Sequence, residues 1–366
     1  MRIAHISTQR GWNGGEQQAC LLVRGLAERG HETLILARAG GLFGRRMALA
    51  GYPVVEFAGS GRSPRAMWQM RRQLAAWRAD VVHFHDGHAL SGGGLAAYRL
   101  PIGARIAARK VAFPLGHAWR YTHLADRVIC VSRAAAQCCM AGGIPADRLH
   151  VVHDGVDPGR IAAGDRERGR RSLGVQPNDV LLLSIGSLTQ IKGHAILLSA
   201  LPQVLARFPR ARLAVAGEGD SRAALERQLS ELHLEHSVDF LGYRSDVPDL
   251  LAAADLFVLP SLAEGLCSTL IDAMLARCPI VASEVGGVPE LLVPDAPESK
   301  PVGRLVPAGD SARLAAALCE TVAGLSGLGE QIDRAFARAM ERFTADRMVD
   351  GTLAVYREVL AGRAAA

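Results

Sequence analysis

The sequence predicts an α/β protein made of two doubly wound domains, each a parallel sheet covered by helices on both faces. Its 366 residues exceed twice the length of a typical domain. In both halves, short apolar runs rich in β-branched residues alternate with amphipathic helical patterns. A charged stretch rich in Gly and Pro interrupts this alternation. We therefore expect a first domain over residues 1–153, a linker over 154–179, a second domain over 180–343 and a closing helix over 344–366.

The first half contains six strand patterns with helical segments between several of them. The expected strands are Ile3–Ser7, Thr33–Ala37, Val54–Phe57, Val81–His85, Arg105–Ala108 and Arg127–Val131. The expected helices are Glu16–Arg29, Arg65–Arg78 and Arg133–Ala141. Apolar runs of this kind, separated by helices, are typical of a parallel sheet buried on both sides.

The second half repeats the alternation. Its expected strands are Val180–Ile185, Arg212–Ala216, Val238–Leu241, Leu256–Leu259, Pro279–Ala282 and Arg304–Val306. Its expected helices are Gly193–Arg207, Ser221–Leu232, Leu266–Ala276 and the tail Thr344–Gly362. Ligands of doubly wound sheets bind outside the carboxyl ends of the strands, so the loops after the strands are where chemistry is expected.

Composition excludes several classes of protein. With 49% apolar and 21% charged residues, the chain can bury a core and is not intrinsically disordered. Its longest stretch without Asp, Glu, Lys or Arg has 14 residues, and a membrane-spanning helix needs about 20. The amino terminus reads as a strand and not as a signal peptide, which predicts a cytoplasmic protein. Seven cysteines without a C-x-x-C pair, and twelve histidines without H-E-x-x-H, call for neither a disulfide framework nor a metal.

Charge is divided unequally along the chain. Residues 1–150 hold 20 Lys and Arg against 8 Asp and Glu, which sums to +12, whereas the remainder sums to −6. Either the first half meets an anionic partner, such as a membrane surface, or its basic surface is simply solvated. The stretch Arg62–Arg78 combines five Arg with Met and Trp residues, which fits a core-facing helix or an interfacial one. A nucleic-acid partner is disfavoured because aromatic residues make up only 5% and no known motif is present.

Three glycine-rich turns follow expected strands. The first, GWNGGE, contains Gly14 and Gly15; the second, GSLTQIKG, contains Lys192; the third, GEGD, contains Gly217 and Gly219. Glycine lets backbone approach a bound group closely, and a helix start after such a turn suits an anion. None is a G-x-G-x-x-G fingerprint or a P-loop, so each could also be an ordinary turn.

The segment PSLAEGLCSTLIDAM is the most informative. Glu264 lies in a loop after an apolar strand, and Asp272 follows it along the expected helix. The free amides at the helix start favour a diphosphate, Glu264 can accept hydrogen bonds from sugar hydroxyls, and Asp272 can accept two from a ribose diol. The pattern therefore favours a sugar nucleotide, although two acids on a helix can also be solvated.

Taken together, these motifs resemble the retaining glycosyltransferases of family 4, which have the GT-B fold. The resemblance runs over nearly the whole chain. It rests on the GGE loop, DVVHFH at residues 80–85, ADRVICVS at 125–132, VVHDGVD at 151–157, the KG turn, GEG, and the EGL…DAM…PIVASEVGGVPE signature. It implies two Rossmann-like domains that face a central cleft, the first on the acceptor side and the second binding the nucleotide sugar. Bacterial enzymes of this family often build lipopolysaccharide or other surface polysaccharides.

The resemblance also assigns roles to single residues. It implies catalytic roles for Glu264, Lys192 and His85, with His83 and His88 as alternatives to His85. It implies acceptor-side roles for Arg109 and His117, with His117 also an alternative to His85. It implies a donor-binding set of Gly14, Gly15, Ser187, Lys192, Gly217, Gly219, Glu264, Gly265, Leu266, Cys267, Ser268 and Asp272.

Some positions depart from the family pattern. Many members have Arg where this chain has Ser187, so one cation at the diphosphate is missing. Asp272 stands where the acid is often Glu, and Asp154 where many members have Asn. The segment RKVAFP replaces a motif that carries Thr and His in other members, which makes Arg109 the expected local contact.

The implied function is transfer of a sugar from a nucleotide-diphosphate sugar to a glycan or lipid-linked acceptor, in lipopolysaccharide or other cell-surface glycan synthesis. The implied mechanism retains the anomeric configuration and needs neither a metal nor a cofactor, since Lys192 and helix amides serve the diphosphate. The expected location is the cytoplasm, including the inner face of the membrane if the basic half binds it. The alternatives are an epimerase or hydrolase on the same fold, or a non-catalytic sugar-nucleotide-binding protein.

Overall fold

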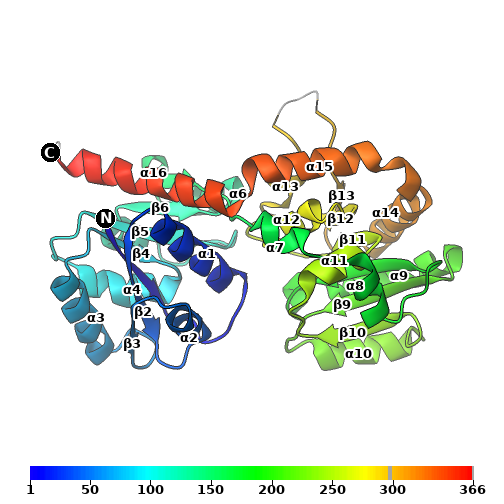
Figure 1. The fold of residues 1–366 in the computed structure, drawn as a ribbon, viewed down its shortest axis with the longest axis horizontal. Helices are drawn as coiled ribbons and strands as arrows, with labels where there is room; N and C mark the ends of the chain where they lie inside the picture. Colours follow the sequence, from blue (N-terminus) through cyan, green and yellow to red (C-terminus); the bar gives the residue numbers. More distant parts are fainter. Residues whose placement is uncertain (296–298, 365–366) are drawn as a thin grey trace. The chain divides into compact units, whose positions relative to one another are not determined.

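The computed structural model describes residues 1–295 and 299–364, which form two compact units (Figure 1). The first unit combines residues 1–155 with the tail from residue 345, and the second spans residues 156–344. Each unit is a parallel sheet with helices packed on it, as the alternation of strand and helix patterns predicts. The predicted α/β fold with two doubly wound sheets is therefore confirmed.

The sheet of the first unit has seven parallel strands in the order β3-β2-β1-β4-β5-β6-β7. They are β1 (Arg2–Ser7), β2 (Glu32–Arg38), β3 (Val54–Phe57), β4 (Val81–Phe84), β5 (Ala104–Arg109), β6 (Arg127–Cys130) and β7 (Leu149–Val151). From β1 the chain moves outward to β2 and β3, then returns to place β4 on the other side of β1. The switch point of this sheet therefore lies between β1 and β4, where ligands of doubly wound folds bind.

The helices of this unit begin at polar caps that the sequence provides. Asn13 and Glu16 form a capping box at the start of α1, and Ser63, Asp86 and Ser132 cap α3, α4 and α6. The helices are α1 (Gly14–Glu28), α2 (Leu42–Leu49), α3 (Pro64–Trp77), α4 (Gly87–Ala97), α5 (Ala118–Leu124), α6 (Arg133–Ala141), the 3₁₀ turn η1 (Ala146–Arg148) and α16 (Ala345–Ala364).

Helix α16 is an integral part of the first unit, beside α1 (Figure 1). Its residues Met348, Leu353 and Tyr356 join one hydrophobic cluster with α1, β1, β4 and β5. Arg29, which follows the last residue of α1, also donates to Asp346 and Asp350 of α16, each at 2.9 Å. The end of the chain thus completes the core of the unit that begins it.

The second unit repeats the design with six parallel strands in the order β10-β9-β8-β11-β12-β13, which puts its switch point between β8 and β11. The strands are β8 (Val180–Ile185), β9 (Ala211–Ala216), β10 (Val238–Gly242), β11 (Leu256–Leu259), β12 (Ile280–Ser283) and β13 (Arg304–Val306). The helices are α7 (Pro158–Ala162), α8 (Arg166–Ser172), η2 (Gln190–Lys192), α9 (His194–Arg207), α10 (Arg222–Glu231), α11 (Val247–Ala253), α12 (Ser268–Leu275), α13 (Val288–Leu292), α14 (Ser311–Ala323), η3 (Leu325–Gly327) and α15 (Gly329–Arg342).

The structure differs from the predicted linker over residues 154–179. Most of this stretch forms α7 and α8, and α8 packs on α11 within the second unit. The charges that suggested a solvated linker are paired: Arg168 donates to Asp249 at 2.5 and 2.6 Å, and Arg166 donates to Asp255 at 2.5 Å. Only glycine fits at position 169, because an added Cβ would lie 2.2 Å from the carbonyl oxygen of Asp249. Gly169 therefore lets α8 pack closely on α11, and the arginines of this stretch form ion pairs with acids at α11 and β11.

Within the described residues, no helix is both long and apolar enough to cross a membrane. All seven cysteines are free thiols.

Candidate functional site

The loops that follow β8 and β11 meet at the switch point of the second sheet. The β8 loop carries Gly186, Ser187 and Lys192, and the β11 loop carries Ser261 and Glu264. Gly193 ends the first loop with a φ of 66°, and an added Cβ would lie 1.9 Å from the carbonyl oxygen of Pro260. Glycine at this position thus lets the two loops approach each other closely.

Lys192 and Glu264 form an ion pair at the centre of this region. Lys192 Nζ donates to Glu264 Oε1 at 2.6 Å, and Ser261 Oγ donates to the same oxygen at 2.7 Å. Glu264 is only 8% exposed. Burial works to lower the pKa of Lys192, but the Glu264 carboxylate more than offsets it, so the net shift is upward. Lys192 is therefore cationic, as binding of an anion requires.

The neighbourhood of Lys192 also contains His194 and Cys267. Burial, and then the charge of Lys192, lowers the pKa of His194 to about 4, so this imidazole is neutral near pH 7. Burial raises the pKa of the Cys267 thiol to about 12, assisted by Glu264. A thiol with that pKa stays protonated and is not a nucleophile at neutral pH.

Helix α12 begins later than the sequence predicts. Its first residue is Ser268, and Cys267 before it has a φ of 83°, a left-handed conformation that is rare outside glycine. Gly265 and Leu266, the predicted first residue of the helix, therefore lie in the loop, and Leu266 is buried at 2% exposure. Strained backbone of this kind is concentrated at functional sites.

Asp272 is buried on α12 and paired with a residue that the sequence analysis did not identify. Arg160 Nη2, from α7, donates to Asp272 Oδ1 at 2.6 Å. Burial raises the pKa of Asp272 to about 6, although Arg160 acts in the opposite direction. The carboxylate of Asp272 therefore has a cationic partner within the protein itself.

The glycines of the GEG turn are required by the protein's own backbone. An added Cβ on Gly217 would lie 1.8 Å from the carbonyl oxygen of Gly186, and one on Gly219 would lie 2.4 Å from that of Leu188. Gly286, from the VGG signature, is similar, because an added Cβ would lie 1.8 Å from the carbonyl oxygen of Glu264. These glycines therefore let neighbouring backbone pack closely against the loop of Glu264 and the loop of Ser187. The Ser187 side chain is exposed.

In the first unit, Gly14 and Gly15 form the first turn of α1, directly after the cap residue Asn13. Gly15 N donates to Asn13 Oδ1 at 2.8 Å, and Glu16 accepts from Asn13 N at 3.2 Å. Glu16 therefore has a capping role. Gly14 is exposed and Gly15 half-buried, so this helix start is open to a ligand.

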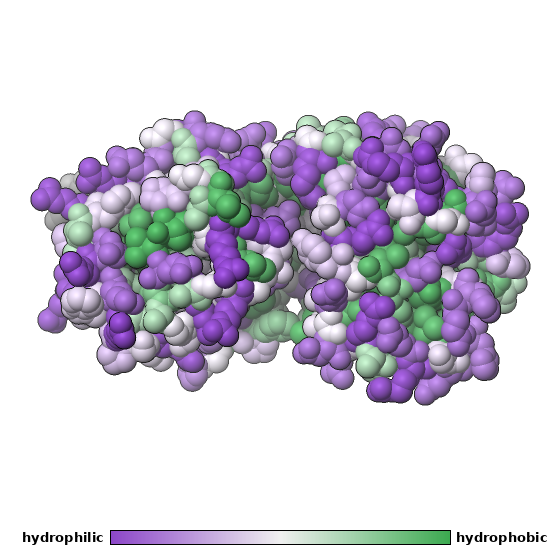
Figure 2. All heavy atoms as spheres, turned by 60° about the horizontal axis from the view of Figure 1, so that its bottom comes forward, coloured by the Kyte–Doolittle hydropathy of each residue, from purple (hydrophilic) through white to green (hydrophobic). Residues whose placement is uncertain are grey.

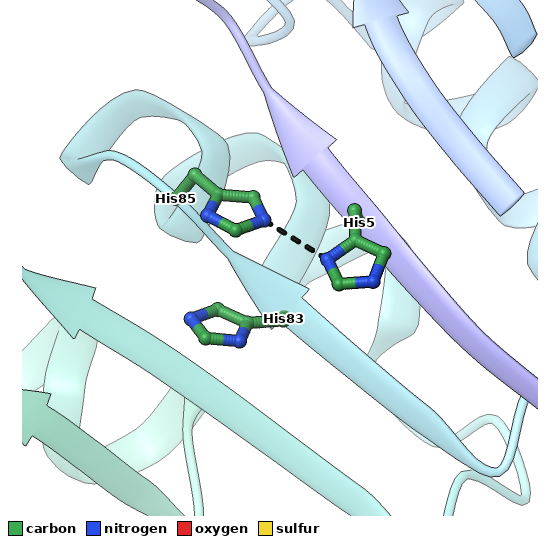
Figure 3. A group of neighbouring side chains, drawn as sticks. All are labelled: His5, His83 and His85. Carbon is green, nitrogen blue, oxygen red and sulfur yellow. Dashed lines mark hydrogen bonds between the residues drawn. The ribbon is translucent and has the colours of Figure 1, made fainter. Parts of the chain in front are cut away.

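The predicted residue His85 lies at the switch point of the first sheet, just after β4, together with His83 and His5 (Figure 3). His5 Nδ1 is 3.0 Å from His85 Nε2, and His83 Nδ1 is 2.5 Å from the hydroxyl of Tyr356. Burial lowers the pKa of His5 to about 3 and those of His83 and His85 well below their ordinary value. All three rings are therefore neutral at physiological pH.

The other acceptor-side candidates are dispersed. Arg109 ends β5 and donates to the carbonyl of Phe113 at 2.5 Å. His117 directly precedes α5 and His88 is the second residue of α4, and both are exposed. Beside Arg109, Lys110 forms an ion pair with Asp154.

The structure thus adds residues that sequence reasoning missed. His5, Tyr356, Lys110 and Arg160 lie far along the chain from their partners, so only the fold brings them together. One signal was available for Lys110: it and Lys192 are two of only three lysines in the chain, and both are paired with an acid. Asp154, noted as a departure from the family pattern, is the acid that pairs with Lys110.

Comparison with known proteins shows which protein families the two halves of the chain match. Residues 12–160 match the model described as Glycosyltransferase Family 4, and residues 179–323 match the model described as Glycosyl transferases group 1. An uncharacterized glycosyltransferase of Methanocaldococcus jannaschii is 31% identical over 239 residues, which is 60% of this chain and 61% of that protein. A D-inositol 3-phosphate glycosyltransferase of Mycobacterium marinum is 31% identical over 221 residues, 58% of this chain and 46% of that protein. The chain therefore spans about half to three fifths of the length of these relatives.

Solved structures extend the similarity to the whole fold. HepE of Anabaena, crystallised with UDP and glucose, superposes with a TM-score of 0.85 and 23% identity, covering 98% of this chain and all of that one. The two matched segments take up most of the sequence. They identify the chain as a protein of glycosyltransferase domains on the GT-B fold.

Proposed function

We propose that this protein is a retaining glycosyltransferase that moves a sugar from a nucleotide-diphosphate sugar to an acceptor in cell-surface glycan synthesis, such as that of lipopolysaccharide. The observation that carries the proposal is the Lys192–Glu264 pair at the switch point of the second sheet. The buried carboxylate of Glu264, which also accepts a hydrogen bond from Ser261, and the cation of Lys192 offer the two contacts that a sugar diphosphate needs. The crystallisation of HepE with UDP and glucose supports a donor of this class.

The role proposed for each donor-side residue follows from its chemistry. Lys192 neutralises the diphosphate as it leaves, and the amides of Gly265–Ser268 hydrogen-bond its oxygens. Glu264 accepts hydrogen bonds from hydroxyls of the donor sugar, and Asp272, together with Arg160, binds the ribose. The leaving diphosphate itself assists deprotonation of the acceptor on the same face, so no enzymatic nucleophile is needed. Catalysis then depends on positioning and electrostatic stabilisation, without a metal or another cofactor.

The exposed side chains of α3 lead us to propose that the acceptor is held at the cytoplasmic face of a membrane. Its apolar face is partly used by the core, since Met70 and Leu74 are buried, but Trp68 is 60% exposed with the Arg72 guanidinium 5.7 Å from its ring. Figure 2 shows one face of the molecule, on which hydrophobic residues lie in patches among hydrophilic ones. Attraction to such a membrane would therefore come from positive charge combined with a few exposed aromatic residues.

The test is an incubation of the purified protein with a panel of nucleotide sugars, with and without candidate acceptors, followed by nucleotide release. Acceptor-dependent release is expected for one donor, undiminished by EDTA, and NMR of the product should show the anomeric configuration of the donor. Release without any acceptor would favour a hydrolase, and binding without release would favour a non-catalytic protein. An inverted anomer would contradict the retaining mechanism.

A further inference from the structure

The three histidines at the switch point of the first sheet invite interpretation as a metal site. One nitrogen from each of His5, His83 and His85 lies within 4.8 Å of the others. The rings, however, are stacked: those of His83 and His85 have centroids 4.5 Å apart and planes inclined by 7° (Figure 3). A metal binds an imidazole nitrogen along the plane of the ring at about 2.0–2.1 Å. Two parallel stacked rings cannot both point a lone pair at one ion, so hydrogen bonding explains this cluster better.

The hydrogen bond between His5 and His85 restricts what His85 can offer to a ligand. His5 Nδ1 and His85 Nε2 are 3.0 Å apart, so Nε2 of His85 is already engaged. The ring nitrogen that remains for a bound molecule is Nδ1. His85 is also half-buried, whereas His5 and His83 are 0% and 3% exposed. His85 is therefore the member of the cluster that a ligand can reach.

The position of the proton follows from the buried side of His5. Nε2 of His5 is buried and has no hydrogen-bond partner among the described residues. A neutral imidazole carries one N–H and one bare nitrogen, and an N–H buried without an acceptor is costly. The favoured arrangement keeps the proton of His5 on Nδ1, where it donates to His85 Nε2. The proton of neutral His85 must then be on Nδ1.

We propose that His5 is a positioning residue for His85, which makes His85 present its Nδ1–H as a hydrogen-bond donor to the molecule bound at this end of the sheet. The identity of that molecule, a sugar or acceptor with a hydroxyl or anionic oxygen, rests on the proposed function. A bound oxygen would accept this hydrogen bond, and His85 would stabilise negative charge there. His85 would not act as a general base, because its two nitrogens are occupied by a proton and by His5.

The test uses the chain of 366 residues labelled with ¹⁵N-histidine. Two-bond ¹H–¹⁵N correlation spectra distinguish Nδ1–H from Nε2–H rings, and His85→Gln assigns the signals of His85. We expect the Nδ1–H form of His85 in the unaltered protein. His5→Leu should abolish this single form, whereas His5→Asn should retain it, because the amide N–H of Asn stands near the position of Nδ1. Tyr356→Phe is the matched control, since it removes the partner of His83 and should leave His85 unchanged.

Three results that do not depend on activity would overturn the proposal. They are an Nε2–H form of His85 in the unaltered protein, an Nδ1–H form that persists in His5→Leu, and binding of one Co²⁺ per chain with visible absorption that is lost in His85→Gln. If sugar transfer is observed, His5→Leu should also lower kcat, by at most about 10²-fold, because His85 is no longer held in the Nδ1–H form and its donor is partly lost, and His5→Asn should restore kcat. An unchanged kcat in His5→Leu would equally contradict the proposal. If no transfer is found, the proposed function fails while the NMR result stands alone.

Discussion

Asp272 is a buried carboxyl that pairs with Arg160, and its proposed role in binding the donor can be tested by substitution. We expect Asp272→Asn to weaken donor binding more than it lowers turnover at saturating donor, because the proposed ribose contact lies away from the bond that breaks. Steady-state kinetics with calorimetric titration of the nucleotide provide the comparison. A large loss of kcat at unchanged donor affinity would mean that Asp272 acts on the reaction itself.

The raised pKa of Asp272 also predicts how stability depends on pH. The protonated carboxyl contributes stability below its unfolded pKa of 3.8, and this contribution is lost as pH rises through about 6. Asp272→Asn removes the effect. The stability of the variant relative to the unaltered protein should therefore rise between pH 4.5 and 7.5, by at most about 3 kcal/mol. Urea unfolding at several pH values measures it, and a relative stability that falls over this range would show that Arg160 dominates.

At the scale of elements, the contact between α8 and α11 is the feature that sequence reasoning misread. Helix propensity alone predicts that Gly169→Ala stabilises the protein by about 1 kcal/mol. The structure predicts the opposite sign, because the new Cβ would meet the Asp249 carbonyl oxygen at 2.2 Å, and overpacking costs about 1–3 kcal/mol.

Gly329→Ala is the matched control for this comparison, since Gly329 begins α15 with open space around its Cβ position. Urea unfolding of both variants should show a loss for Gly169→Ala and little change or a small gain for Gly329→Ala. A gain in stability for Gly169→Ala would mean that α8 is not held against α11 as described.

Strands were easier to predict than the contacts between helices, for physical reasons. A buried parallel strand such as Val180–Ile185 carries an apolar run that is visible locally, so most strands could be placed from the sequence. The edge strand β7 (Leu149–Val151) was missed because it is short and only partly buried. The Arg and Gly residues of α8 look like a linker until Asp249 and Asp255, more than 80 residues away, are brought next to them.

The candidate site shows the same division. Glu264 and Lys192 could be selected from the sequence because each lies in a distinctive loop after a strand. Their 2.6 Å contact depends on β8 and β11 being neighbours, which strand patterns alone do not reveal. The pairing of Arg160 with Asp272 and of His5 with His85 likewise depends on the fold.

At the scale of the whole molecule, the +12 charge of residues 1–150 predicts association with anionic membranes. We expect salt-sensitive sedimentation with vesicles that contain anionic lipid and little with neutral vesicles. Arg65→Gln with Arg72→Gln should reduce this binding. Arg71 is left unaltered, because it donates to the carbonyls of Ala96 and Tyr98 at the end of α4 and therefore has a structural role.

The matched control replaces two exposed arginines of the second unit, Arg227 and Arg313, by Gln. This double variant changes the net charge equally and should bind vesicles like the unaltered protein. Equal binding to neutral and anionic vesicles at low salt, or binding to neither, would show that the proposed association with anionic membranes is wrong. A soluble acceptor would then take its place.

In the proposed mechanism, Lys192 binds the diphosphate of the donor and Glu264 binds its sugar. The most direct measurement is the rate of donor consumption by Lys192→Ala and Glu264→Ala, with circular dichroism to establish folding. Each variant should lose at least about 10²-fold in turnover, the scale of removing one charge-stabilising contact. Lys300→Ala, which removes an exposed lysine, should behave as the unaltered protein. If both site variants fold and retain near-normal transfer, the donor is bound elsewhere, and Lys192 and Glu264 are not its binding residues.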